Sequence, residues 1–337
     1  MRTYFVTGGA GFIGSAFVKQ LLERQSDANV VNYDALTYAG NLANLDGVDA
    51  ERHTFVRGDI CDRNSVLSAM PVGCDAVFNF AAESHVDRSI ESADEFLRTN
   101  IIGTQVLLDA ARSKGVTRFV QVSTDEVMGS LADESDDYFT EDSLLQPNSP
   151  YAASKAAAEF VVRAARETHG VDAVITRCGN NYGPRQFPEK LIPLMIANAL
   201  NDEPLPVYGD GKNVRDWIYV DDHCAGIWAA YERGVNGKAY NIGARNEQYN
   251  IDVVTAILDA LGKPHSLIKY VTDRLGHDRR YAIDPTLAET ELGWKPATTW
   301  MDGLAATIDW YISNREWVER IRSGEYREYY QKMYGGR

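Results

Sequence analysis

The sequence predicts an α/β protein built on a doubly wound parallel sheet, with a smaller α/β lobe in its carboxyl-terminal half. Through the first half of the chain, short apolar stretches typical of buried strands alternate with amphipathic stretches typical of helices. A glycine-rich turn at residues 8–14 joins the first predicted strand to the first predicted helix. Beyond residue 180 the elements become shorter, so we expect one domain over 1–179, rejoined by segments near 214–245, and a second lobe over 180–337.

The composition and net charge indicate which kinds of molecule the protein can bind. The chain has 337 residues, 45% hydrophobic and 24% charged, and a net charge of -14. This charge argues against nucleic acid or an anionic membrane as partner, although local arginines and lysines could still bind a phosphorylated substrate. The cysteines at 61, 74, 178 and 224 show no CxxC spacing, which argues against a metal site and favours a reducing compartment. With no long apolar run and no signal-peptide pattern, we expect a cytoplasmic protein.

The glycine turn lies in the context that dinucleotide binding requires. A strand is predicted at residues 3–7 and a helix at 16–24, and Gly8, Gly11 and Gly14 lie between them. Such glycines let a pyrophosphate approach the backbone at a helix N-terminus. We therefore predict a Rossmann-type domain with a dinucleotide cofactor; a turn that is merely tight is the alternative.

Two further strand ends favour NAD. Asp34 ends the second predicted strand, residues 29–34, about 20 residues after Gly14. A carboxylate there accepts from ribose hydroxyls and repels a 2′-phosphate, which favours NAD over NADP; a cap or turn residue is the alternative. The third predicted strand, 54–58, leads to Asp59 and Ile60, which we expect near the adenine.

The fourth predicted strand, 76–80, runs into a polar loop. His85 in this loop could serve as a base, but a histidine hydrogen-bonded within its loop is the favoured interpretation. Ser84 and Arg88 are better placed to contact a ligand. A long helix is predicted over residues 94–112, and Thr99 near its start is expected to reach the cofactor.

The stretch at residues 119–129 organises the predicted chemistry. A short apolar strand is followed at its carboxyl end by Thr124, Asp125 and Glu126. Ligands bind outside the carboxyl ends of strands in open parallel sheets, so adjacent carboxylates there suit proton chemistry. The alternative is that they cap the following turn. The acidic stretch 131–147 is predicted to be a surface loop that could cover the site as a lid.

Tyr151 and Lys155 lie four residues apart at the start of a predicted helix and therefore share one face of it. A tyrosine with a pKa of about 10 needs a decrease worth about 4 kcal/mol to act as a base near neutrality. The ammonium of Lys155 and a positive nicotinamide ring can lower that pKa together. Lys155 can also hold the nicotinamide ribose.

These motifs resemble those of a known superfamily. Residues 7–14 together with Tyr151 and Lys155 are similar to the extended short-chain dehydrogenase/reductases. Four further stretches narrow the match: LTYAGN at 36–41, STDE at 123–126, NNYGPRQFPEKL at 180–191 and DRLGHD at 273–278. Over nearly the whole chain they resemble the dTDP-glucose 4,6-dehydratases, and the Asp-Glu pair is the most diagnostic because related epimerases lack it.

The resemblance implies tightly held NAD and dTDP-glucose as substrate. The implied cofactor contacts are Gly8, Gly11, Phe12, Ile13, Gly14, Asp34, Leu36, Thr37, Asp59, Ile60, Phe80, Ala81, Ala82, Ser84, Thr99, Tyr151, Lys155 and Asn181. The implied substrate contacts are Ser84, Arg88, Thr124, Asn180, Glu189, Lys190, Leu191, Pro206, Tyr208, Arg215, Asn250, Arg274 and His277. Lys190, Arg215 and Arg274 would supply positive charge for the diphosphate, and Tyr208 would stack on the base.

The resemblance also implies a division of chemical roles. Tyr151 removes the proton of the sugar 4-hydroxyl while C4 is oxidised, and Thr124 hydrogen-bonds the same oxygen. Glu126 then removes the proton at C5, and Asp125 protonates the departing 6-hydroxyl. Two carboxyl groups with opposite roles need environments that separate their pKa values, and like-charge repulsion between neighbours favours this separation.

Several points stay open. Met128 stands where the family usually has tyrosine, and we expect it near the pocket, where it would affect substrate fit or rate; Gly179 and Leu275 also depart from the commonest residues. A 4-epimerase or decarboxylase of the same superfamily, which would not need the acid pair, and a sensor that holds NAD without turnover are the alternatives. The nucleobase is undecided, since thymine and uracil differ by one methyl group. The resemblance further implies a homodimer through the helices at 94–112 and 151–169.

Overall fold

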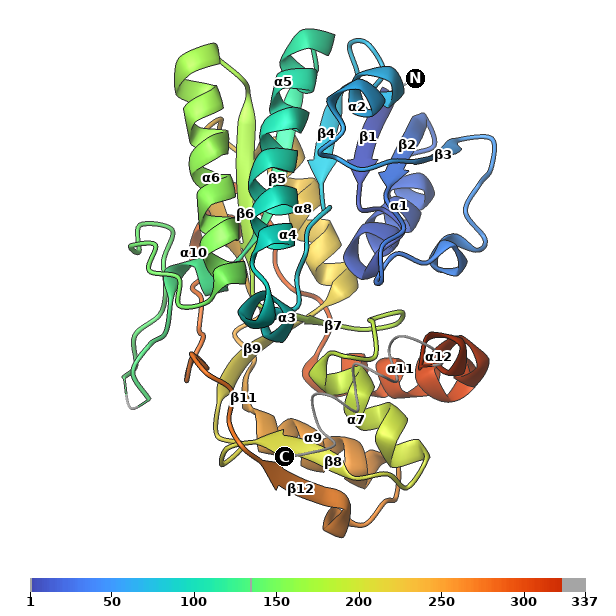
Figure 1. The fold of residues 1–337 in the computed structure, drawn as a ribbon, viewed down its shortest axis with the longest axis vertical. Helices are drawn as coiled ribbons and strands as arrows, with labels where there is room; N and C mark the ends of the chain where they lie inside the picture. Colours follow the sequence, from blue (N-terminus) through green and yellow to red (C-terminus); the bar gives the residue numbers. More distant parts are fainter. Residues whose placement is uncertain (1, 134, 323–337) are drawn as a thin grey trace.

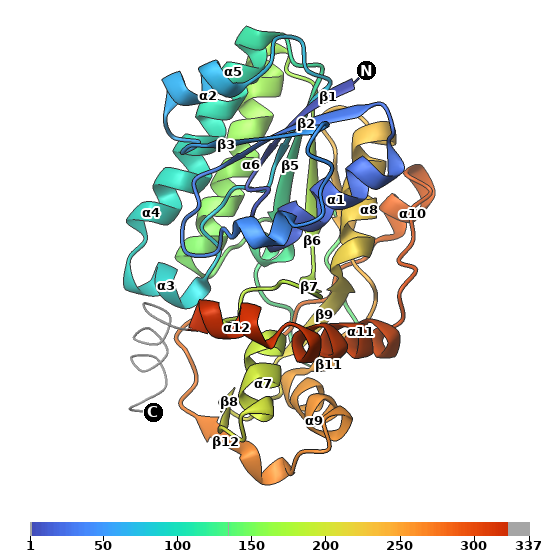
Figure 2. The same ribbon diagram turned by 90° about the vertical axis from the view of Figure 1, so that its right-hand side faces the viewer.

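The computed structural model describes residues 2–133 and 135–322 (Figures 1 and 2). A seven-stranded sheet carries helices on both faces, and a smaller lobe lies below it in Figure 1, beyond the carboxyl ends of the strands. Residue 134 of the predicted lid and residues 323–337 of the predicted second lobe lie outside the described residues.

The large sheet is parallel throughout and has the order β10-β6-β5-β4-β1-β2-β3. Its strands are β1 (Arg2–Thr7), β2 (Ala28–Asp34), β3 (His53–Arg57), β4 (Ala76–Asn79), β5 (Arg118–Thr124), β6 (Ala173–Cys178) and β10 (Ala239–Ile242). The predicted doubly wound sheet is thereby confirmed. The chain reverses its direction of winding between β1 and β4, which opens a crevice at the carboxyl ends of these strands.

Helices cover both faces of this sheet (Figure 2). One face carries α1 (Phe12–Arg24), α8 (Val220–Arg233) and α10 (Thr286–Glu291); the other carries α2 (Arg63–Ala69), α3 (Val86–Glu91), α4 (Asp94–Leu97), α5 (Thr104–Lys114) and α6 (Pro150–His169). Buried aliphatic and aromatic side chains fill the layer between each set and the sheet. The single helix predicted over 94–112 consists of α4, a π-helical segment Arg98–Gly103 and α5.

The smaller lobe has its own apolar core. Its elements are β7 (Asn180–Tyr182), α7 (Leu191–Leu200), β8 (Leu205–Tyr208), β9 (Val214–Tyr219), β11 (Glu247–Tyr249), α9 (Asn250–Ala260), β12 (Ile268–Val271), α11 (Trp300–Ser313) and α12 (Arg315–Arg322). Short helical turns lie at Leu42–Leu45, Asp125–Met128 and His265–Leu267. Within residues 2–133 and 135–322, no helix has both the length and the apolar composition to cross a bilayer.

The expected return of residues 214–245 to the large sheet is only partly correct. Helix α8 packs on the sheet and β10 joins it, but β9 pairs with β7 and β11 in a separate three-stranded sheet. The buried carboxylate of Asp216 on β9 accepts the backbone N–H groups of Ala244 (3.2 Å) and Asn246 (2.8 Å). These bonds hold β9 against the chain that leads into β11.

The acidic loop at residues 131–147 is not a lid. The backbone N–H groups of Leu131 and Phe139 donate to Arg280 and Ala282 carbonyl oxygens at 3.0 and 2.9 Å. The side chain of Phe139 is buried in an apolar cluster beside β5. None of the described residues in this loop lines the two cavities at the carboxyl ends of the strands. Burial of Phe139 therefore holds the loop beside the site.

Candidate active site

Local structure places the five predicted catalytic side chains in one cavity. Strand β5 ends at Thr124, whose hydroxyl oxygen accepts the Glu126 N–H at 3.4 Å and so starts a tight turn. Helix α6 begins after Ser149, which caps it by accepting the N–H of Ala152 at 3.1 Å. Tyr151 thus lies in the first turn of α6. Thr124, Asp125, Glu126, Tyr151 and Lys155 all line a cavity of about 390 Å³. Their roles remain predictions.

The two adjacent acids have different surroundings. Burial and the charges of Glu126 and Asp216 raise the pKa of Asp125 well above its ordinary value. Its Oδ1 accepts from the Thr124 hydroxyl at 3.2 Å, while Oδ2 is buried without a hydrogen-bond partner in the described part of the chain. A carboxyl held protonated in this way is suited to donate a proton.

Glu126 is surrounded by positive charges. Burial raises its pKa, but the charges of Arg274, Lys190 and Arg215 act in the opposite direction. Burial has the largest effect on the pKa of both acids, but among the charged groups carboxylates act most on Asp125 and cations act most on Glu126. The site therefore favours the protonated form of Asp125 more strongly than that of Glu126, as an acid and a base side by side require.

The expected lowering of the Tyr151 pKa is not produced by the protein's own groups. Burial and the charges of Glu126, Cys178 and Asp125 raise the pKa of Tyr151 well above its ordinary value, and only a hydrogen bond with Thr124 opposes them. The Lys155 Nζ donates to the Val122 carbonyl at 2.7 Å, and burial lowers the Lys155 pKa to about 8. The expected activation of Tyr151 by Lys155 together with a bound positive nicotinamide ring therefore stays a prediction, since it requires the cofactor.

The larger cavity fits a dinucleotide. Gly8 has φ +69°, and a Cβ there would lie 2.6 Å from Ala81 N; a Cβ on Gly14 would lie 2.2 Å from Gly8 O. A side chain at either position would clash with the backbone, so the tight turn before the N-terminus of α1 requires glycine at both. The predicted cofactor residues that line the cavity are Gly8, Gly11, Phe12, Ile13, Gly14, Asp34, Thr37, Asp59, Ile60, Phe80, Ala81, Ala82, Ser84, Thr99, Tyr151, Lys155 and Asn181. Leu36 does not line it, because its positive φ of 54° leads the chain around Asp34.

Asp34 lines the cavity and also holds the turn. Its Oδ2 accepts the Ala10 N–H at 2.9 Å and its Oδ1 accepts the Leu36 N–H at 2.8 Å. Each oxygen retains a second lone pair that can accept from a ribose hydroxyl. Asp34 can therefore hold the turn and accept from the ribose hydroxyls at the same time.

Asp34→Asn is expected to weaken NADH binding about tenfold and NADPH binding much less, because a charge-assisted acceptor is lost while repulsion of the 2′-phosphate disappears. Fluorescence titration of cofactor-depleted protein measures both dissociation constants. Asp62→Asn is the control, because its carboxylate also accepts two backbone N–H groups but lines neither cavity. Equal losses for NADH and NADPH would mean that Asp34 acts through the turn alone.

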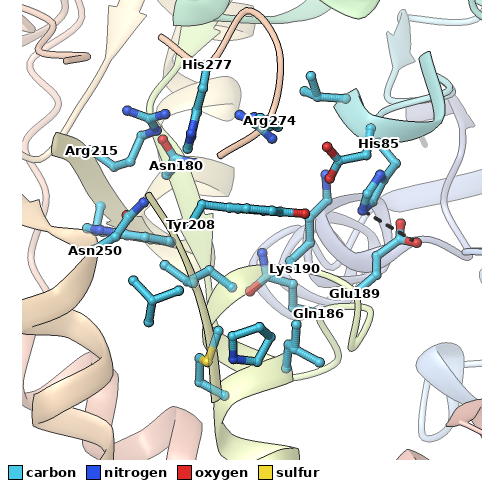
Figure 3. A pocket seen from close by; sticks show the side chains of 18 of the residues that line it. His85, Asn180, Gln186, Glu189, Lys190, Tyr208, Arg215, Asn250, Arg274 and His277 are labelled. Carbon is cyan, nitrogen blue, oxygen red and sulfur yellow. Dashed lines mark ion pairs between the residues drawn. The ribbon is translucent and has the colours of Figure 1, made fainter. Parts of the chain in front are cut away.

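A smaller cavity of about 160 Å³ lies between the large sheet and the second lobe (Figure 3). The predicted substrate residues that line it are Asn180, Glu189, Lys190, Leu191, Pro206, Tyr208, Arg215, Asn250, Arg274 and His277; Ser84 and Thr124 line the larger cavity instead. The two cavities share Glu126, Asn180, Asn181, Gln186, Glu189 and Lys190. A group bound in one cavity therefore meets a group bound in the other at Glu126.

Two buried polar atoms of the smaller cavity have no hydrogen-bond partner within the described residues. They are the guanidinium Nε of Arg274 and the amide Oδ1 of Asn250. Tyr208 lies between them in Figure 3, with its ring 6.0 Å from and nearly perpendicular to that of His277. A cationic donor, an amide acceptor and an aromatic ring in one cavity suit a nucleoside diphosphate.

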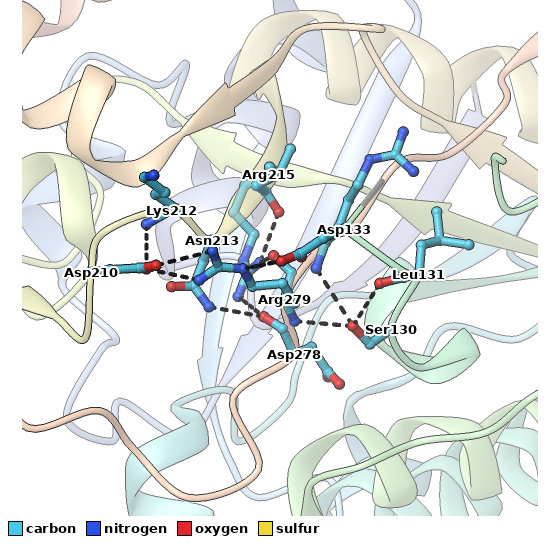
Figure 4. Close-up of polar contacts among 11 residues, drawn as sticks. Ser130, Leu131, Asp133, Asp210, Lys212, Asn213, Arg215, Asp278 and Arg279 are labelled. Carbon is cyan, nitrogen blue, oxygen red and sulfur yellow. Dashed lines mark hydrogen bonds and ion pairs between the residues drawn. The ribbon is translucent and has the colours of Figure 1, made fainter. Parts of the chain in front are cut away.

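Arg215 is hydrogen-bonded to the backbone of the segment at residues 278–280 (Figure 4). Its Nη2 donates to the Asp278 carbonyl at 2.9 Å and its Nη1 to that of Val214 at 2.7 Å, and the guanidinium lies 4.3 Å above the Tyr281 ring. Arg279 connects this segment to two loops, with ion pairs to Asp133 (2.9 Å) and Asp210 (2.8 Å). Arg215 is therefore rigidly placed at the cavity wall.

Two predicted positions besides Leu36 do not line the site. Arg88 lines neither cavity, since its Nη2 lies 3.3 Å from Glu189 Oε2. Met128 also lines neither; it is buried in the cluster of Phe139, with its sulfur 3.9 Å from Arg177 Nη1. The tight turn after Thr124 directs position 128 away from the cavities, so the expected position of Met128 near the pocket is wrong.

Sequence reasoning missed other residues of the site. Tyr38 and Gln186 line the larger cavity and belong to stretches that carried the family resemblance, so that signal could have found them. Asp216, which influences Asp125, follows Arg215 directly but gave no signal of its own. His85 lines the smaller cavity, where burial and nearby cations lower its pKa well below the ordinary value, in keeping with a neutral loop histidine.

A buried ion pair connects β6 and α6 next to β5, the strand that ends at Thr124. Arg177 on β6 pairs with Glu159 on α6, with Nη2 and Oε2 separated by 2.7 Å and both side chains less than a tenth exposed. Glu159 also accepts from the Ser123 hydroxyl at 2.5 Å. The residue before Thr124 is thus tied to the helix that carries Tyr151.

Arg177→Met is expected to lower the free energy of unfolding by about 3 to 5 kcal/mol, because it leaves Glu159 buried without its cation. Urea unfolding measures this change. Arg63→Met, which removes an exposed pair with Asp109, should cost less than about 1 kcal/mol. The double variant with Glu159→Met should lose less than Arg177→Met alone; an equal or larger loss would contradict the charge argument.

The comparisons with known proteins agree on one family. Residues 5–307 match the family model described as GDP-mannose 4,6 dehydratase. The dTDP-glucose 4,6-dehydratase of Xanthomonas campestris pv. campestris strain B100 is 51% identical, over 97% of this chain and 98% of that protein. DesIV of Streptomyces venezuelae, a dTDP-glucose 4,6-dehydratase solved with NAD bound, has a TM-score of 0.92 at 51% identity and covers 95% of this chain and 99% of its own.

An epimerase is less similar. The UDP-glucose 4-epimerase of Thermotoga maritima matches with a TM-score of 0.85 at 28% identity, over 93% of this chain and 99% of its own. The fold is therefore shared across the superfamily, whereas the sequence is closer to the dehydratases and includes the Asp125-Glu126 pair. The chain belongs to the nucleotide-sugar 4,6-dehydratase family that the matching model describes and, within it, to the dTDP-glucose 4,6-dehydratases.

Proposed function

We propose that the protein converts dTDP-glucose to dTDP-4-keto-6-deoxyglucose and water. The observation that carries this proposal is the pair of adjacent buried acids, Asp125 among carboxylates and Glu126 among cations, in the cavity that also holds Tyr151. An acid and a base side by side are what removal of a proton from C5 and of a hydroxyl from C6 requires.

The chain's own residues supply the proton transfers. Bound NAD would supply the acceptor for the hydride of C4 and the donor of that hydride to C6. Tyr151 takes the proton of the 4-hydroxyl, and Thr124 hydrogen-bonds the same oxygen. The resulting ketone acidifies C5, whose proton passes to Glu126 while Asp125 protonates the departing 6-hydroxyl, so that water leaves. C5 takes up a proton again when C6 receives the hydride.

The remaining residues divide between the two ligands. The glycine turn and Asp34 would hold NAD, with residues 1–179, α8 and β10 as its domain. Arg274, Lys190 and Arg215 would hold the diphosphate, and Tyr208 and Asn250 would contact the nucleobase. Among the described residues, the Nε of Arg274 and the Oδ1 of Asn250 find no hydrogen-bond partner, and this supports the assignment.

A 4-epimerase oxidises C4 but eliminates nothing, so it has no use for a protonated acid beside a base. A sensor that only holds NAD has no use for Tyr151 at a cavity shared with the substrate residues. The surroundings of Asp125 and Glu126 therefore favour the dehydratase over both alternatives.

A homodimer in the cytoplasm is part of this proposal. Leu97, Ile102 and Phe160 expose 43%, 55% and 57% of their surface on α4, the π-helical segment and α6, which pack against one another. Exposed apolar side chains on adjoining helices support an interface between two copies through this face.

The proposal is tested by incubating the purified protein with dTDP-glucose, without added cofactor, and recording the mass of the nucleotide-sugar. Loss of one water is the expected result, and a parallel incubation with UDP-glucose compares the nucleobases. An unchanged mass with a new epimer would make the protein an epimerase. No reaction with either sugar in the presence of added NAD would contradict the proposed function.

A further inference from the structure

Three segments far apart in the sequence meet at the junction of the two cavities. They carry Tyr38, from the turn after β2; Arg88, from α3; and Glu189, from the segment before α7, and we call these three residues the clasp. The guanidinium carbon of Arg88 lies 4.1 Å above the centre of the Tyr38 ring, and its Nη2 lies 3.3 Å from Glu189 Oε2. The Tyr38 hydroxyl acts to lower the pKa of Glu189, which places the two side chains near each other.

The clasp forms part of the wall of the cofactor cavity. Tyr38 and Glu189 line that cavity, and Glu189 also lines the smaller one. Arg88 lies behind them and contacts both. Phe187 strengthens the same junction, since its ring is 5.5 Å from the Tyr38 ring and perpendicular to it. The turn after β2 and the segment before α7 are thus joined across the cavity.

The ion pair of the clasp differs from an ordinary surface pair. The side chain of Glu189 is 2% exposed, and burial raises its pKa to about 7 against the opposing effects of Lys190 and Arg88. Figure 3 shows a second contact of the same carboxylate, with His85 Nε2 at 3.8 Å. Exposed ion pairs contribute little to stability, but loss of one partner of a desolvated charge has a large effect.

We propose that Tyr38, Arg88 and Glu189 retain the nicotinamide dinucleotide by closing the cavity wall between the turn after β2 and the segment before α7. This inference rests on the proposed function, in which the hydride removed from C4 must return to C6 of the same sugar. Release of the reduced cofactor before that step would leave a 4-keto sugar that is not reduced at C6. An enzyme with this reaction sequence therefore needs a slow rate of cofactor release.

The experiment measures cofactor release without any sugar. Protein loaded with NADH is mixed with excess NAD, and the decrease in NADH fluorescence gives the dissociation rate. Glu189→Gln and Arg88→Met are each expected to accelerate release about tenfold, and the double variant no more than the faster single variant. Tyr38→Phe removes only the hydroxyl, which influences Glu189 and Ser84, and it tests the clasp with the least risk to folding.

Glu291 provides a matched control. Its carboxylate accepts from a cation and a tyrosine, Lys238 at 2.6 Å and Tyr240 at 2.8 Å, but on α10, away from both cavities. Glu291→Gln should leave the release rate unchanged. An unchanged rate in all clasp variants, or an effect on substrate KM alone, would overturn the clasp. Failure of the wild type to bind NADH would instead overturn the proposed function.

Discussion

Glu126→Gln is expected to stop the reaction after the oxidation of C4. The amide keeps the shape of the side chain but cannot accept the proton from C5, so turnover should fall by about 10² to 10⁴-fold. In the proposed mechanism, oxidation of C4 depends on Tyr151 and Thr124, which the substitution leaves in place. The variant should therefore accumulate enzyme-bound reduced cofactor and an oxidised sugar that has kept its water.

The absorbance of reduced nicotinamide, recorded after mixing with dTDP-glucose, measures the first half of this expectation, and the mass of the nucleotide-sugar measures the second. Glu141→Gln is a suitable control, because burial also raises the pKa of this carboxyl but it lines neither cavity. Wild-type turnover in Glu126→Gln would remove Glu126 from the mechanism. Slow turnover without reduced cofactor would place Glu126 in the oxidation step instead.

The parts of the site that follow from local structure could be predicted from sequence. The glycine turn is a strand, a tight turn and a helix in direct succession, so Gly8 and Gly14 could be placed from the sequence alone. Tyr151 and Lys155 share a helix face because they are four residues apart. The carboxyl-end rule for parallel sheets then places Thr124 near both.

The electrostatic environment of the acids could not be predicted in the same way. Asp216, which raises the pKa of Asp125, lies on a strand of the small sheet, and the cations around Glu126 come from three separate segments of the second lobe. Which charges face which acid depends on how that lobe packs against the sheet. Sequence reasoning took the opposite roles of the two acids from the family resemblance and explained them by like-charge repulsion. These roles stay predictions, and the contribution of Asp216 was missed.

The predicted positions of Met128 and Arg88 were wrong, because a short turn or a long side chain decides where each side chain points. Position 128 is two residues from Glu126, yet the tight turn directs it into the apolar cluster around Phe139. Arg88 follows the fourth strand of the chain, which led us to predict a ligand contact. Its long side chain instead contacts Tyr38 and Glu189. Neither outcome is encoded in spacing, because both depend on partners contributed by distant segments.

Tyr151→Phe is expected to prevent the oxidation of C4 and so to reduce turnover by about 10² to 10⁴-fold. Only the hydroxyl is lost, and the ring can keep its edge-to-face contact with Phe96, whose centroid is 6.4 Å away. The fold should therefore persist. Tyr240→Phe, a buried tyrosine on β10 that lines neither cavity, should retain activity.

The absorbance of reduced nicotinamide separates this variant from Glu126→Gln. Tyr151→Phe should show none after addition of dTDP-glucose, whereas Glu126→Gln should accumulate it. Because burial and two carboxylates raise the pKa of Tyr151, its activation depends on a positive charge in the cofactor cavity. If Tyr151→Phe formed reduced cofactor at the wild-type rate, another group would remove the 4-hydroxyl proton, and Glu126, which lines both cavities, would be the first to test. The opposite results of the two variants would fix the order of the steps: a proton leaves through Tyr151 before one leaves through Glu126.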